Sequence, residues 1–276
     1  MTLGIDIGGT NLCFGLVEAG KIVQGFSVPS FPPGASLQQT LDYLSAQIRR
    51  IIRPEVERIG IGVPTVVDIH RGIVYDALNI PSWQEVHLKE YLEKEFGVPV
   101  SVNNDANCFA LGVYGTYPEE DKPEVLVVIA LGTGVGLGIV HEGKLFCGAN
   151  CGAGELCCLP YGGSIIEDFT SKKFLTDRGW DGMEAAKAAR EGNPDALAMF
   201  DAFGRHLGAL LHTVMLAYDP DRIALTGGIA NNHPFFRSSM EAYLREHFPY
   251  GKALERLRID ICTDGDLQVI GASLLK

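Results

Sequence analysis

Long runs of one residue type are missing from this sequence. No extended Lys/Arg run occurs and the formal net charge is −11, so a nucleic-acid partner or an anionic membrane surface is not expected. The longest apolar stretch, Val125 to Val140, is interrupted by glycines and a threonine, which excludes a membrane-spanning helix there. The first residues are strand-like, Leu3 to Ile7, and lack the charged and apolar regions of a signal peptide. We therefore expect a cytoplasmic protein that binds neither nucleic acid nor membrane.

Cysteines are few, and their spacing lacks the usual metal signature. The chain has 7, an odd number, and no Cys-x-x-Cys pair occurs. Without a signal peptide, this pattern favours reduced thiols over a disulfide framework. Four cysteines still lie close together in the sequence: Cys147, Cys151, Cys157 and Cys158. They could form a replacement zinc site, but we favour the interpretation that they are buried structural thiols.

The remaining composition is that of an ordinary globular protein. Hydrophobic residues make up 46% and charged residues 21% of 276 residues, enough for one large domain or two small ones. The acidic, proline-containing segment Tyr117 to Pro123 is the best candidate boundary. We predict a smaller N-terminal domain of residues 1–116 with the C-terminal helix 264–276, and a larger domain of residues 117–263.

The same order of predicted elements occurs in both halves of the chain. Three strands come first, and helices and strands then alternate, which predicts an α/β fold with a mixed sheet flanked by helices in each half. In the first half the strands are 3–7, 12–18, 21–26, 59–63 and 98–102, and the helices 37–52, 86–96 and 105–115. In the second half the strands are 124–130, 135–141, 144–147, 222–226 and 257–262, and the main helices 193–218, 234–248 and 266–275.

The stretch Ser101 to Asn107 is the strongest candidate for catalysis. A short β-branched strand ends there on polar residues and turns into a helix, and open α/β sheets bind ligands at such strand ends. Asp105 would lie in the first helical turn, where the helix dipole favours its ionised form, and could accept a proton from a hydroxyl. Helix capping by Asn104 or Asp105 is the competing interpretation.

Two Gly-Thr hairpin turns, one in each half, suggest phosphate binding. Gly8-Gly-Thr10 and Gly132-Thr-Gly134 lie at equivalent places, and such turns can present backbone N–H groups and a hydroxyl to phosphate oxygens. A third glycine element, Thr226-Gly-Gly228, follows a strand, and could present a flat surface to a nucleotide base or ribose. Asp6, inside a strand without an obvious partner, could hold Mg²⁺ through water.

Six motifs in order resemble those of the ROK (repressor, open reading frame, kinase) sugar kinases, which have the actin-like ATPase, ribonuclease H-like fold. They are Asp6-Ile-Gly-Gly-Thr10, Gly60-Ile-Gly-Val-Pro64, Asn103-Asn-Asp-Ala-Asn107, Leu131-Gly-Thr-Gly-Val-Gly136, Gly152-Ala-Gly-Glu155 and Thr226-Gly-Gly228. The resemblance covers essentially the whole chain.

This resemblance implies ATP-dependent phosphorylation of a hexose in a cleft between two domains, by a homodimer. It implies that Asp105 is the catalytic base and that Asp6 is linked to Mg²⁺. Sugar contacts are implied for Asn79, Asn104, Asp105, Glu155 and Glu167. Nucleotide contacts are implied for Gly8, Gly9, Thr10, Asn11, Thr133, Gly134, Gly227 and Gly228.

The sequence departs from the family pattern around Cys158. Most members have a His at this position, which binds zinc and helps to orient the sugar, and a three-cysteine zinc loop follows it. Here that loop is absent, so no structural zinc is expected. Asn11 and Thr65 also replace residues that are usual in the family.

The leading hypothesis is a glucokinase that phosphorylates O6 of glucose. A kinase of another hexose, such as N-acetylmannosamine, N-acetylglucosamine, fructose or allose, is the first alternative, because Cys158 alters the sugar site. A catalytically silent sugar-binding regulator is the second, although Asp105 and both Gly-Thr turns are retained.

Overall fold

The structure is a computed structural model that describes residues 1–77, 79–263 and 266–276. The chain divides into two compact units, and the first contains residues 1–122, 145–153 and 264–276. The second contains residues 123–144 and 154–263. The short segment 145–153 thus packs with the first unit, although the sequence prediction places it in the second domain. Among the described residues, no helix has both the length and the apolar character needed to cross a membrane.

The first unit is built on a mixed sheet of five strands in the order β3-β2-β1-β4-β8. β1 pairs antiparallel with β2 and β2 with β3, as the predicted meander requires. β1, β4 and β8 run parallel, so their carboxyl ends lie at one edge of the sheet. The strands are β1 (Thr2–Ile7), β2 (Asn11–Glu18), β3 (Lys21–Pro29), β4 (Arg58–Val63) and β8 (Val100–Asn104).

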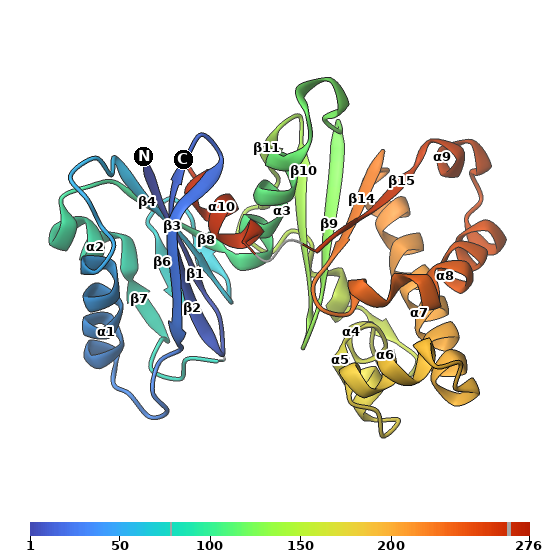
Figure 1. Cartoon of the computed structure of the whole chain (residues 1–276). Helices are drawn as coiled ribbons and strands as arrows, with labels where there is room; N and C mark the ends of the chain where they lie inside the picture. Colours follow the sequence, from blue (N-terminus) through green and yellow to red (C-terminus); the bar gives the residue numbers. More distant parts are fainter. Residues whose placement is uncertain (78, 264–265) are drawn as a thin grey trace. The chain divides into compact units, whose positions relative to one another are not determined.

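Helices cover both faces of this sheet (Figure 1). α1 (Leu37–Arg49) and α2 (Leu88–Phe96) lie on one side, where Leu41 and Leu44 of α1 join the core formed with alternate strand residues. Ser36 begins α1 with a capping box to Gln39, which satisfies two backbone N–H groups at the helix start. The helix predicted over residues 37–52 therefore begins where expected, at Leu37, and ends earlier, at Arg49.

Glycines allow the other face to be covered very closely. α3 (Asp105–Thr116) and α10 (Leu267–Ser273) pack there. A Cβ at Gly60 would lie 1.8 Å from the Ala272 carbonyl oxygen, and one at Gly4 would lie 2.0 Å from that of Val269. Any side chain at these two strand positions would push α10 away from the sheet.

A small three-stranded sheet lies between β4 and α2, in a part of the chain for which the sequence predicted no strands. It consists of β5 (Val67–Asp68), β6 (Ile73–Tyr75) and β7 (Glu85–His87) in that order. The prediction that a helix starts at Val86 was therefore wrong by two residues, because Val86 pairs with Val74 and the helix begins at Leu88.

The second unit has a sheet in the order β11-β10-β9-β14-β15. β9 pairs antiparallel with β10 and parallel with β14, which is parallel to β15. This arrangement repeats the first sheet, so the predicted repeat of element order and the α/β fold class are confirmed. The strands are β9 (Val125–Leu131), β10 (Val135–His141), β11 (Lys144–Leu145), β14 (Arg222–Thr226) and β15 (Arg258–Cys262), with a hairpin of β12 (Pro160–Tyr161) and β13 (Ser164–Ile165). The predicted third strand is shorter than expected and does not reach Cys147.

Helices of the second unit pack around α7, which spans Pro194–Tyr218 and is capped by Asn193 as predicted. Gly204 and Gly208 of α7 admit α8 closely, since a Cβ at Gly204 would lie 2.3 Å from the Phe236 carbonyl oxygen. The other helices of this unit are α4 (Glu167–Thr170), α5 (Lys172–Thr176), α6 (Gly182–Arg190), α8 (His233–His247) and α9 (Gly251–Arg256), with short 3-10 turns η2 (Glu155–Cys158) and η3 (Ala230–Asn232). A third 3-10 turn, η1 (Glu119–Asp121), belongs to the first unit.

Candidate active site

Asp105 is the first residue of α3, directly after the carboxyl end of β8. The helix cap is Asn104, whose side-chain oxygen accepts hydrogen bonds from the Ala106 and Asn107 N–H groups at 2.9 and 3.4 Å. Asp105 is not the cap, and its half-buried carboxylate instead accepts from Ala106 N at 2.8 Å. The first helical turn therefore holds the carboxylate at the edge of the sheet, where the helix dipole favours its negative charge.

Asp6 lies near Asp105 across the parallel strands. Asp6 is in register with Gly62 of β4, and Gly62 with Asn103 of β8. Burial, and after it the negative charge of Asp105, raise the pKa of Asp6 from 3.8 to about 7. Gly62 permits this arrangement, because a Cβ there would lie only 3.5 Å from the Asp105 Cα and 3.2 Å from the Cys108 sulfur. Two carboxylates at one sheet edge are a favourable setting for a divalent cation.

The first glycine turn follows β1 directly and is exposed at Gly9 and Thr10. Its base is closed by a hydrogen bond from Gly8 N to Asn11 O at 2.9 Å. Ser30 holds the turn from one side, with its hydroxyl donating to Gly8 O at 2.9 Å and its backbone N–H donating to Thr10 O at 2.8 Å. The backbone carbonyls are thus turned toward the protein, and the tip of the turn is left for a ligand.

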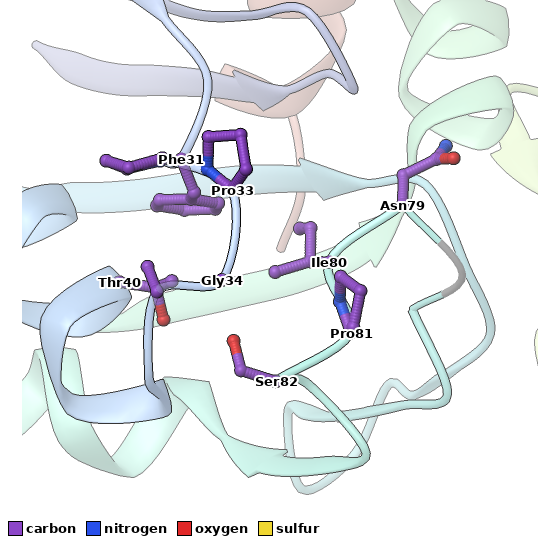
Figure 2. Close-up of a pocket in the computed structure, with 10 residues that line it drawn as sticks. Phe31, Pro33, Gly34, Thr40, Asn79, Ile80, Pro81 and Ser82 are labelled. Carbon is purple, nitrogen blue, oxygen red and sulfur yellow. The ribbon is translucent and has the colours of Figure 1, made fainter.

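Asn79 lies beside this turn, in the loop between β6 and β7. A Cβ at Gly9 would lie 3.5 Å from the Asn79 side-chain nitrogen. Asn79 also stands at the edge of a pocket of about 290 Å³ formed with the segment after β3. Figure 2 shows its amide turned away from Ser82, while Phe31 and Ile80 line the pocket. The first unit therefore brings together the predicted residues Gly9, Asn79, Asn104 and Asp105 with Asp6 at one end of its sheet.

The second glycine turn lies against the carboxylate of Glu167, a contact that the sequence did not predict. Gly132 N donates to Gly134 O at 3.0 Å, and the exposed Thr133 lies at the tip. The Glu167 carboxylate, at the start of α4, accepts from Val135 N at 2.8 Å. It lies so close to Gly134 that a Cβ there would be 2.8 Å from its oxygen. The structure therefore places Glu167, a predicted sugar contact, against the second turn.

A pocket of about 540 Å³ in the second unit joins the second and third glycine elements. Thr133 lines it from the turn after β9, and Gly228 from the turn after β14. Gly227 has a φ of +86°, and a Cβ there would lie 2.4 Å from the Leu131 carbonyl oxygen, so only glycine fits. The other lining residues come mainly from α5, α6 and η3 and include Lys172, Leu175, Asp181, Met183, Ala186, Arg190, Ile229, Asn231 and Asn232.

This pocket has the features of a nucleotide site. Apolar side chains from α6, among them the highly exposed Met183, face a glycine surface, and such surfaces suit the flat face of a base. Lys172 and Arg190 add positive charge to the lining. Sequence reasoning missed both residues, because α5 and α6 carry no glycine motif and reach the pocket only through the tertiary fold.

The four neighbouring cysteines divide into two separate pairs. Cys147 and Cys151 pack in the first unit against Asn103 and Asn107, whereas Cys157 and Cys158 belong to the second unit. In η2 the sulfurs of Cys157 and Cys158 lie 3.8 and 3.7 Å from the exposed Glu155 carboxylate. These three side chains could hold a metal ion. Burial raises the pKa of the Cys157 thiol, and the Cys158 thiol and Glu155 raise it further.

We predict that the purified protein contains no stoichiometric zinc. Structural zinc is held by four ligands in a tetrahedron, whereas η2 offers two adjacent thiols and one carboxylate. The raised pKa of Cys157 also disfavours the thiolate that zinc requires. Elemental analysis of protein purified without added metal should give far less than one zinc per chain. One zinc per chain, lost in a Cys157→Ser variant, would contradict this prediction.

The fold and the site define a class of protein: two α/β units, each with a glycine turn after the first strand of its sheet. Comparison with known proteins agrees with this class. The model of the ROK family matches residues 2–275, and this chain therefore belongs to the ROK family. It is similar to a glucokinase of Halalkalibacterium halodurans, with 28% identity over 266 residues covering 83% of this chain and 80% of the relative. It is also similar to an N-acetyl-D-glucosamine kinase of Aliivibrio salmonicida, with 30% identity over 260 residues, 84% of this chain and 85% of the relative.

Among solved structures, a ROK family glucokinase from Streptomyces griseus in complex with glucose and AMPPNP superimposes with a TM-score of 0.79 at 27% identity. The match covers 99% of this chain and 97% of that chain. The predicted family and the predicted fold class are both confirmed.

Proposed function

We propose that this ROK family protein is an ATP-dependent hexose kinase that transfers the γ-phosphoryl group to O6 of glucose. The observation that carries the proposal is the placement of Asp105 at the carboxyl end of β8, close to Asp6 and in the same unit as the exposed first glycine turn. A carboxylate at such a position can take the proton of an attacking hydroxyl, while the N–H groups of the turn bind phosphate oxygens. The named relatives of this chain, two sugar kinases and a glucokinase structure with glucose bound, support the same reaction class.

The proposed base has the environment that this chemistry needs. Asp105 lies in the first turn of α3, where the helix dipole favours a negative charge. Asp6 is the carboxyl whose pKa is raised, by burial and by the charge of Asp105. As the sugar hydroxyl attacks, its proton passes to the Asp105 carboxylate. Phosphoryl transfer depends mainly on positioning and charge neutralisation, so the sugar must be held firmly. We assign the sugar hydroxyls to hydrogen bonds with Asn79, Asn104, Glu155 and Glu167.

We assign ATP to the pocket of the second unit, with its adenosine against Gly227 and Gly228 and its phosphates against Thr133 and Gly134. The first turn, with Gly8, Gly9, Thr10 and Asn11, would bind the terminal phosphate. The geometry of the Asp6–Asp105 pair fits Mg²⁺, because a cation relieves the repulsion between two carboxylates. Asp6 would hold the ion through water, and the bound ion would neutralise phosphate charge.

Phosphorylation of another hexose is the second candidate function, and two observations support it. One relative at 30% identity is an N-acetyl-D-glucosamine kinase. In addition, Cys158 and Glu155 share one short 3-10 turn, so the group that replaces the usual histidine lies beside a proposed sugar contact. A sulfur in place of an imidazole removes a strong donor and acceptor, which changes the hydrogen bonds available to a sugar hydroxyl or an acetamido group.

A panel of sugars tests the proposal directly. ADP release with ATP and Mg²⁺ should depend on an added hexose, with glucose the best acceptor by kcat/KM and its 6-phosphate as product. N-acetylglucosamine, N-acetylmannosamine, fructose and allose complete the panel, and 6-deoxyglucose is the matched control because it lacks only the accepting hydroxyl. Turnover of 6-deoxyglucose would contradict transfer to O6. Tight sugar binding without any ADP release would instead support the regulator hypothesis.

A further inference from the structure

Two buried thiols lie directly behind the turn that carries Asp105. Cys147 and Cys151 are 8% and 4% exposed, and they lie in the segment 145–153 that packs with the first unit. The thiol of Cys151 donates to the Asn103 side-chain oxygen at 3.1 Å. The Asn107 side-chain nitrogen donates to the sulfurs of Cys151 at 3.5 Å and of Cys147 at 3.7 Å. All four side chains are buried and form one hydrogen-bonded network.

Asn103 is the centre of this network and is joined to the catalytic turn itself. Its side-chain oxygen also accepts from the backbone N–H of Asn104 at 2.8 Å and from the side chain of Asn107 at 2.9 Å. These two bonds tie Asn103, the next-to-last residue of β8, to residues on either side of Asp105. The Cys151 thiol, at 3.1 Å, thus donates to the same oxygen that accepts from the backbone N–H of Asn104, whereas the Cys147 sulfur lies farther from it, at 4.0 Å.

The protonation of the pair suits a donor role for Cys151. Interaction with the neighbouring Cys147 thiol and burial both raise the pKa of the Cys151 thiol. Its single proton has an acceptor in the Asn103 side-chain oxygen at 3.1 Å. The pKa of Cys147 is lowered by its interaction with Cys151 and by the hydrogen bond that the Asn103 amide donates to its sulfur. Cys151 therefore keeps its proton at neutral pH. Its backbone has a φ of +59°, an uncommon conformation for a residue other than glycine, so the loop holds this thiol in place at some conformational cost.

We propose that Cys151 is a positioning residue for the transfer reaction, because its thiol holds Asn103 and thereby the turn that carries Asn104 and Asp105. This inference rests on the proposed function for its effect on turnover. A displacement of a catalytic group by about 1 Å can cost about 10²-fold in rate, so a weak S–H donor can matter here although it adds little to stability. Without it, a buried acceptor loses one partner in a network where each bond supports the others.

Three substitutions at position 151 separate the donor from the space it fills. Cys151→Ala and Cys151→Val both remove the donor, the first leaving a gap and the second nearly filling it, whereas Cys151→Ser keeps a hydroxyl donor. Because a β-branched residue is strained at the φ of +59° found here, the comparison of Ala with Ser is the decisive one. We expect kcat for the sugar to fall about tenfold in the Ala and Val variants. This loss is smaller than the roughly 10²-fold cost of a full 1 Å displacement, because the turn should shift by less than that. The Ser variant should recover to within about threefold of wild type, because a hydroxyl replaces the thiol as donor. KM for ATP should stay unchanged, since the nucleotide pocket belongs to the other unit.

Cys262→Ala, in β15 of the second unit, is the matched control for loss of a thiol. It should leave kcat unchanged. An Ala variant with wild-type kcat, or a Ser variant as slow as the Ala variant at equal thermal stability, would overturn the proposal.

Hydrogen exchange of residues 101–108 gives a readout that does not depend on turnover. The backbone N–H of Asn104, bonded to Asn103, should exchange faster in the Ala and Val variants and at the wild-type rate in the Ser variant. If wild-type protein phosphorylates no sugar, the proposed function fails, and exchange alone then decides the role of Cys151. Unchanged exchange in the Ala and Val variants would overturn that role.

Discussion

Asp105→Asn should lower sugar phosphorylation by about 10²–10⁴-fold, the usual contribution of a positioned general base. The amide keeps the shape of the carboxylate but cannot accept the hydroxyl proton at neutral pH. Asn104 caps the helix independently of position 105, so α3 should form as before. Removal of the negative charge beside Asp6 also removes one cause of the raised Asp6 pKa. The fold should therefore be at least as stable as in wild type.

The measurement is kcat for the sugar, together with ATP affinity by calorimetry. ATP affinity should change little, because the pocket to which we assign ATP belongs to the other unit. Asp195→Asn is a matched control, since Asp195 is also in the first turn of a helix, α7, and is exposed. This control loses the same favourable dipole interaction but no catalytic group. Turnover within tenfold of wild type for Asp105→Asn would remove Asp105 from the role of base.

Short-range patterns were enough to predict the framework of this protein. The cap at Ser36, the Asn193-Pro194 start of α7 and both Gly-Thr turns are local signals, in which a few neighbouring residues decide the backbone. The repeat of strand and helix order predicted two similar sheets, and both have the same topology. The sequence could not predict the sheet of β5, β6 and β7, because strands of two or three residues are too short for a detectable period.

Contacts between distant residues were predicted less well. Lys172 and Arg190 reach the nucleotide pocket from helices without any motif. The proximity of Asp6 to Asp105 depends on the order β1-β4-β8, and the sequence alone does not give strand order. Neighbours in sequence were misleading for the cysteines, since the chain passes from one unit to the other between Ala153 and Gly154 and separates the two pairs.

Asp6→Asn should make the protein more stable and less active. The pKa of Asp6 is raised from 3.8 to about 7, mainly by burial and then by the charge of Asp105. Between about pH 4 and pH 7 the folded state therefore binds a proton that the unfolded state has lost. Stability falls as pH rises through this window, because the folded state must then accept an unfavourable charge. Asparagine has the same shape and does not ionise, so the variant avoids this cost.

The stability gain should thus be absent near pH 4, grow with pH and level off above about pH 7. Allowing for partial exposure, we expect a gain on the order of 1–3 kcal/mol at pH 8, equivalent to a rise in Tm of about 2–8 °C. Thermal scans of both proteins from pH 4 to pH 8 measure this difference. Equal Tm values at pH 8 would contradict the raised pKa.

Turnover should fall by about tenfold or more in the same variant, because a metal-linked carboxylate contributes charge that an amide cannot replace. Mg²⁺ provides the decisive comparison. If Asp6 helps to hold the ion, then Mg²⁺ should raise the Tm of wild type at pH 8 and have little effect on the variant, since ligand binding to the folded state stabilises it. Asp195→Asn should respond to Mg²⁺ as wild type does. An equal increase in Tm for wild type and Asp6→Asn would show that Asp6 does not hold the metal. Asp6 would then be only a buried acid that destabilises the fold, and it would affect catalysis only through its interaction with the charge of Asp105.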